Sequence, residues 1–151
     1  MATNGAYTRI VVPVLAGRES ERAVRAACGL AADRGASISA VAVVEVPPLL
    51  PLEAHMDEEE ADARKALQQA QAIADSFGVA LTGTVVRARE ASSAIIGQAA
   101  EADAQVVVLG ARRRLNGVPH APVFGRTAGT VLKESPCRVV LVSAPLNGRC
   151  E

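Results

Sequence analysis

The sequence predicts an α/β fold: a single doubly wound domain in which helices cover both faces of a five-stranded parallel sheet. Short β-branched apolar runs alternate along the chain with longer stretches whose apolar residues recur every three or four positions. Half of the residues are hydrophobic but only 2% are aromatic, so the core has to be built from Ala, Val, Leu and Ile. A chain of 151 residues can bury one sizeable core but not two.

Five strands are predicted from the apolar runs. Residues 9–15 and 38–46 are continuous runs, which is typical of strands that are covered on both faces. Residues 82–88 alternate imperfectly between apolar and polar side chains, and residues 105–109 and 138–142 are again continuous. The order of strands and helices along the chain calls for a parallel sheet, because each pair of neighbouring strands is joined through a helix.

Four helices are predicted between these strands. The first begins near Glu19, whose charge suits the positive end of a helix dipole, and it closes at Gly35, which can form a C-terminal cap. The others are expected at 57–78, 91–102 and 125–134. An irregular segment must precede the long second helix, because prolines lack the backbone donor that a helix or strand needs. These prolines are Pro47, Pro48 and Pro51.

The domain is predicted to span residues 9–143, with an N-terminal tail at 1–8 and a C-terminal tail at 144–151. Sixteen basic and sixteen acidic residues balance, and the scarcity of aromatic rings removes base-stacking platforms, so nucleic acid is not an expected partner. The sequence shows neither a signal peptide nor an apolar stretch long enough for a membrane span, so we expect a cytoplasmic protein without membrane insertion.

Residues suited to catalysis or metal binding are scarce. His55 and His120 have no serine or cysteine plausibly paired with them, and the phosphate-binding motif with its lysine is absent. Glu45 ends a strand and is expected to be an ordinary exposed carboxylate, while Ser92 and Ser93 are expected to help start the helix that they occupy. The sequence therefore predicts no catalytic residue, no metal site and no enzyme, with a weak ATPase as the upper limit.

One segment combines features of an anion site. Gly110 ends a strand and can let the backbone approach a ligand, and the helix that opens at Gly125 offers free N–H groups and a positive dipole end. Four arginines add fixed charge in a planar fork that matches phosphate. They are Arg112, Arg113, Arg114 and Arg126. The alternative is a solvated basic loop, with Arg126 as an ordinary residue of the first helical turn.

The strands "RIVVPV" and "VAVVEV", and above all "VVVLGARRR…VFGRTAGTVLKESPCRVVLV", resemble the universal stress protein family over roughly residues 9–143. The resemblance implies a sheet of order 3-2-1-4-5 and a homodimer formed through the last strand, Arg138 to Val142. It also implies an adenine nucleotide as ligand, since many members bind ATP or AMP through the pattern Gly-x2-Gly-x9-Gly-Ser/Thr.

This chain departs from the pattern at several positions. Gly110 and Gly125 match its first and third glycines, but Arg113 stands at the second, Arg126 replaces the Ser/Thr, and the loop is two residues longer. Leu15 occupies the position of the family's adenine-side aspartate. The nucleotide-binding residues that the resemblance implies are Pro13, Val14, Leu15, Val43, Leu109, Gly110, Arg112, Arg113, Gly125, Arg126 and Thr127.

Two functions follow as hypotheses. The first is a regulatory module that binds AMP, ATP or a cyclic adenine dinucleotide such as cyclic di-AMP through an arginine-bearing phosphate loop. The second is a nucleotide-free dimerisation or scaffold protein that acts through protein partners. The segment "LGARRR…APVFGRT" also resembles stress-protein domains attached to amino-acid permeases and cation antiporters, which makes a membrane transporter a possible partner.

Overall fold

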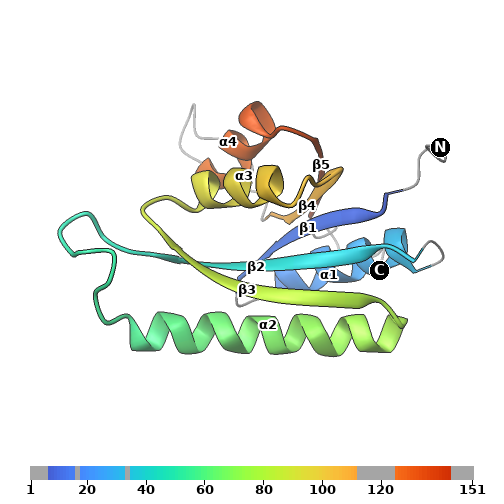
Figure 1. Cartoon of the computed structure of the whole chain (residues 1–151), viewed down its shortest axis with the longest axis horizontal. Coiled ribbons are helices and arrows are strands. Elements are labelled where there is room, and N and C mark those ends of the chain that lie inside the picture. Colours follow the sequence, from blue (N-terminus) through green and yellow to red (C-terminus); the bar gives the residue numbers. More distant parts are fainter. Residues whose placement is uncertain (1–6, 16–17, 33–34, 112–124, 144–151) are drawn as a thin grey trace.

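A computed structural model describes residues 7–15, 18–32, 35–111 and 125–143 of the chain (Figure 1). The strands form one sheet in the order β3-β2-β1-β4-β5, and every neighbouring pair is parallel. They are β1 (Arg9–Val14), β2 (Ser37–Glu45), β3 (Ala80–Ala88), β4 (Val106–Gly110) and β5 (Arg138–Val142). The helices are α1 (Arg18–Ala31), α2 (Asp57–Phe77), α3 (Ala91–Glu101) and α4 (Arg126–Glu134). The predicted fold class and strand order are confirmed.

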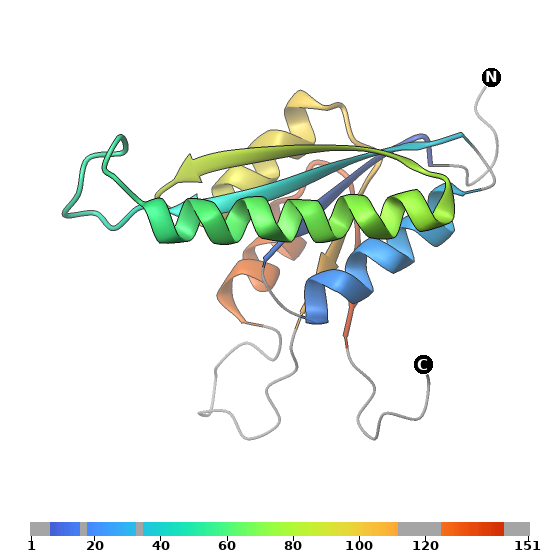
Figure 2. The ribbon, with the colours of Figure 1, turned by 90° about the horizontal axis from the view of Figure 1, so that it is seen from below.

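Helices cover both faces of the sheet. Helices α3 and α4 lie on one face, and α1 and α2 lie side by side on the other, which is the face seen in Figure 2. Successive side chains of a strand point to opposite faces, so Val12 of β1 packs with α1 and α2 while Val11 packs with α3 and α4. The buried residues of α2 are all alanines, which lets the helix lie close to the sheet without aromatic packing. They are Ala63, Ala66, Ala70 and Ala74.

Glycine ends the long helix as the sequence predicts. Gly78 has a φ of 68°, in the left-handed region that a side chain disfavours. Its N–H donates to the Asp75 carbonyl oxygen at 3.1 Å, and the N–H of Val79 donates to the Ala74 carbonyl oxygen at 3.0 Å. These bonds satisfy carbonyls that the last helical turn would otherwise leave free, and they turn the chain directly into β3.

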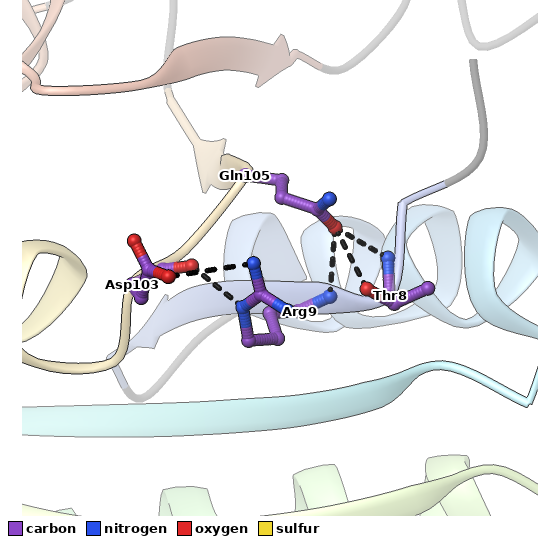
Figure 3. Close-up of polar contacts among 4 residues, drawn as sticks. All are labelled: Thr8, Arg9, Asp103 and Gln105. Carbon is purple, nitrogen blue, oxygen red and sulfur yellow. Dashed lines mark hydrogen bonds and ion pairs between the residues drawn. The ribbon is translucent and has the colours of Figure 1, made fainter. Parts of the chain in front are cut away.

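A polar network fixes the amino-terminal ends of β1 and β4 (Figure 3). The side-chain oxygen of Gln105 accepts hydrogen bonds from the backbone N–H of Thr8 at 2.6 Å, from its hydroxyl at 3.0 Å and from the N–H of Arg9 at 3.1 Å. The Arg9 guanidinium donates to the Asp103 carbonyl oxygen at 2.7 Å and lies 3.6 Å from its carboxylate. This network aligns the two central strands, so that their carboxyl ends also meet in a fixed register.

The remaining structural expectations concern the ends of the molecule. Most of the two predicted tails lies outside the described residues, so the domain limits stay a prediction. Within the described ranges, no helix is long and apolar enough to cross a membrane.

Candidate functional site

A cleft of about 480 Å³ lies at the carboxyl ends of β1, β2 and β4. Clefts of this size hold small organic ligands, and this edge of an open α/β sheet is where such ligands bind. Nine of the eleven residues predicted from the sequence line it: Pro13, Val14, Leu15, Val43, Leu109, Gly110, Gly125, Arg126 and Thr127. The other two, Arg112 and Arg113, lie outside the described residues, as does His120.

Apolar side chains line much of the cleft. Val43 and Leu109 were predicted, whereas Val41, Ile95 and Ala128 were missed. Val41, Val43 and Glu45 are two residues apart on β2, so the strand period alone places them on one face. Ile95 and Ala128 come from α3 and α4, and only the packing of these helices against the sheet brings them to the cleft. An apolar slot between sheet and helices suits a flat aromatic ring system.

Glu45 does more than the sequence suggested. Its Oε2 accepts a hydrogen bond from the backbone N–H of Ala91 at 3.2 Å, and it thereby caps the start of α3 from a neighbouring strand. Ser92 and Ser93 lie in the first turn of this helix, and the residue that precedes the helix, Glu90, makes no side-chain capping hydrogen bond. A negative charge at this position is favourable, since the N-terminal end of a helix is positive.

Two contacts fix the first turn of α1 at the cleft. A side-chain carbon on Gly110 would lie 2.2 Å from the carbonyl oxygen of Glu19, so the absence of a side chain here is required by the packing of α1. The hydroxyl of Ser20 accepts a hydrogen bond from the N–H of Leu15 at 2.7 Å. The sequence predicted that the backbone at Gly110 would let a ligand approach closely. In the structure, the group that lies close to Gly110 is the backbone of α1. The sequence missed Glu19 and Ser20 as cleft residues.

The N-terminus of α4 opens into the cleft. Gly125 precedes the helix with a φ of 91° and, as a glycine, has no side chain to cap the leading N–H groups of the helix. Arg126 is the first residue of the helix and is exposed. This end of the cleft is therefore positive, both from the helix dipole and from the guanidinium.

The other described charges of the cleft are Glu19 and Glu45. Glu45 lies near the start of α3, and Arg126 lies at the start of α4. The α4 end of the cleft, with Arg126, therefore suits an anionic group, whereas the apolar lining suits a flat apolar body. Across the described part of the chain, no group of three or more His, Cys, Asp or Glu side chains could hold a metal ion.

Comparisons with solved structures show the same fold. UspA from Lactobacillus plantarum is 24% identical, with a TM-score of 0.72 over 92% of this chain and 99% of that one. A universal stress protein from Archaeoglobus fulgidus in complex with dAMP is 23% identical, with a TM-score of 0.70 over 90% and 98%. A universal stress protein in complex with cAMP is 20% identical, with a TM-score of 0.71 over 92% and 98%.

A search of curated proteins finds no match. The sequence model of the universal stress protein family, in contrast, matches residues 6–143, which is nearly the whole chain. The segments that carry the resemblance lie within this range. The chain therefore belongs to the universal stress protein family.

Proposed function

We propose that this protein is a regulatory module that binds an adenine nucleotide in the cleft at the carboxyl edge of the sheet. Members of its family are regulatory proteins rather than classic enzymes. The observation that carries the proposal is the arrangement of the cleft, in which apolar residues such as Val43 and Ile95 adjoin the N-terminus of α4 and Arg126. The complexes of two structural relatives with cAMP and dAMP support this ligand class.

In the proposed complex, the base lies against the apolar residues of β2, β4 and α3, and the phosphate lies at the start of α4. The N–H groups of the first turn and the Arg126 guanidinium would donate to phosphate oxygens. Arg112 and Arg113, which the sequence also predicts for this site, lie outside the described residues. AMP, ATP and a cyclic dinucleotide such as cyclic di-AMP all carry the chemistry that this arrangement recognises.

The test is a calorimetric titration of the protein with AMP, ATP and cyclic di-AMP at moderate salt. We expect micromolar binding of one of them, and a loss of roughly 10- to 150-fold in Arg126→Ala, because a charge-assisted hydrogen bond contributes about 1.5–3 kcal/mol. Arg64→Ala, at an exposed position of α2 away from the cleft, is the matched control and should bind normally. Equal affinities of Arg126→Ala and wild type would contradict the phosphate site.

A nucleotide-free scaffold function is the second candidate, and the position of Leu15 favours it. This side chain is 65% exposed and lies in the cleft where a carboxylate is expected from the family pattern. An exposed apolar side chain at a cleft can fill it or contact another protein. Absence of binding by all three nucleotides, from a folded protein, would favour this function.

A homodimer through β5 is proposed with either function. Among the residues that the structure describes, strand β5 is the edge of the sheet and pairs with β4 alone, and its residues Val139 to Val142 are partly exposed. An unpaired apolar edge invites pairing with another strand. Light scattering should give twice the chain mass of 15.5 kDa. A wild-type monomer at micromolar concentration would rule the dimer out. Regulation of a membrane transporter and a cytoplasmic location stay predictions.

A further inference from the structure

The segment that joins β2 to α2, residues 46–56, extends beyond the end of the sheet, and we call it the arm (Figures 1 and 2). It consists of two successive turns, each of which begins at a proline. The N–H of Leu50 donates to the Pro47 carbonyl oxygen at 3.0 Å, and the N–H of Ala54 donates to the Pro51 carbonyl oxygen at 3.0 Å. Prolines restrict φ, so the arm has less conformational freedom than an ordinary loop of this length.

Two arginines from the end of β3 hold the backbone of the arm. The Nη1 atom of Arg89 donates to the carbonyl oxygens of Pro47 at 2.5 Å and Leu50 at 2.7 Å, which belong to the first turn. The Nη1 atom of Arg87 donates to those of Leu52 at 2.8 Å and Ala54 at 2.5 Å, which belong to the second. The arm is anchored at its two ends by the buried side chains of Val46 and Met56, and between them these guanidinium groups hold its backbone.

Most of the side chains that the arm exposes to water are apolar. Leu49 is 96% exposed, and Leu50 and Leu52 are each 41% exposed. Single exposed leucines are common, but three within four residues, next to three exposed prolines, form a continuous apolar tip. Leu49 contributes almost nothing to the core of the monomer. Core packing therefore does not explain why this exposed position carries an apolar side chain.

Acidic residues border this tip. Glu53, Asp57, Glu58 and Glu59 are all exposed. The nearby positive charges are turned toward the arm itself, since Arg87 pairs with Glu60 and Arg89 binds backbone carbonyls. An anionic membrane surface would repel this border. Two arms meeting tip to tip would also bring like charges together, which disfavours a second copy of the chain as the occupant.

We propose that the arm is a docking element for a protein partner that offers an apolar pocket bordered by lysine or arginine. The apolar tip enters the pocket, and the acidic border meets the basic one. The arginines hold the arm in its bound shape beforehand, which reduces the entropy lost on binding. The arm is separate from the apolar slot of the cleft, so this inference does not depend on nucleotide binding.

The first experiment identifies the contact. The photo-activated cross-linking residue p-benzoylphenylalanine replaces Leu49 in the full chain, expressed in its own cells, and the cross-linked peptides are mapped by mass spectrometry. The control carries the same residue at Leu132, a half-exposed leucine of α4. We expect cross-links from position 49 to one protein, at an apolar site flanked by Lys or Arg. Equal cross-linking from both positions, or cross-links only to lipid or to a second copy of this chain, would overturn the proposal.

The second experiment measures affinity with the purified partner. Leu49→Ser should weaken binding by about tenfold or more, because a fully buried leucine contributes roughly 1.5–3 kcal/mol, whereas Leu132→Ser should leave it unchanged. Arg89→Gln leaves the leucines of the tip unchanged but removes the guanidinium that holds the first turn of the arm. This variant should therefore bind the partner more weakly than the wild type, although Leu49 is still present. Raising the salt concentration should lower the affinity. Affinity that responds neither to Leu49→Ser nor to salt would contradict both parts of the proposal.

Discussion

Replacement of Gly110 by alanine should destabilise the protein strongly, although it adds a single methyl group. The new carbon would lie 2.2 Å from the carbonyl oxygen of Glu19 and 3.3 Å from its side-chain carbon. Favourable contacts between carbon atoms begin near about 3.5 Å, so an overlap of more than an ångström has to be relieved. The obstacle is the backbone of α1, which cannot rotate away as a flexible side chain could.

The magnitude follows from this geometry. Overpacking a close-packed interior costs about 1–3 kcal/mol, and a rigid backbone neighbour places this substitution at the upper end. For a chain of this length, a loss of about 3 kcal/mol lowers Tm by roughly 6–12 °C. Movement of the first turn of α1 would also shift Glu19 and Ser20, which line the cleft, so we expect weaker ligand binding as a secondary effect.

The assay is urea unfolding followed by circular dichroism, with thermal unfolding as a second readout. Gly97→Ala is the matched control, because no atom lies within 4 Å of the added carbon and the position is an exposed site within α3. Alanine there should raise the free energy of unfolding by about 0.5–1 kcal/mol. If Gly110→Ala were as stable as the wild type yet lost nucleotide binding, the glycine would serve the ligand and our account of it would be wrong.

Two other positions give independent predictions. Gln105→Leu removes the acceptor shared by the N–H groups of Thr8 and Arg9. It should lower the free energy of unfolding by about 1 kcal/mol and speed hydrogen exchange at both amides. The control Gln98→Leu loses a single exposed contact and should change the free energy of unfolding by less than about 0.5 kcal/mol. Equal effects of the two would refute the network in Figure 3. Burial raises the pKa of the Cys28 thiol, so iodoacetamide should label the folded protein at Cys137 well before Cys28. The stability due to the neutral Cys28 thiol is fully present below the ordinary thiol pKa of about 8.5 and is lost as the pH rises toward the higher value of the folded state. Rapid labelling of Cys28 without unfolding would contradict its burial.

The sequence was sufficient for the fold because local signals and the global arrangement agree. Continuous valine and isoleucine runs are typical of buried strands, and Gly78, where the predicted second helix ends, is the C-cap of α2. The boundaries differ from those predicted by a few residues, for example at β3, which begins at Ala80 rather than Thr82. Pairing with β2 extends this strand, and the side-chain pattern of β3 alone does not reveal that pairing.

The candidate site was predicted only in part, for a physical reason. Pro13, Val43 and Leu109 were predicted because they match positions of the family pattern, and they lie near the carboxyl ends of strands, where open α/β sheets bind ligands. Contacts between elements far apart in the sequence leave no local pattern. The cap that Glu45 provides for α3 and the approach of Glu19 to Gly110 are both of this kind. The hold of Arg87 and Arg89 on the arm likewise depends on β3 lying beside β2.

The most direct test of the central claim, a nucleotide held in this cleft, is a methyl-resolved NMR titration with AMP, ATP and cyclic di-AMP. One of the three should perturb the methyl groups of Val43, Ile95 and Leu109, which line the cleft, and leave those of Ile38 and Val24, in the core on the other face of the sheet, unchanged. Perturbation centred elsewhere, or no perturbation by any of the three at millimolar concentration, would contradict the claim.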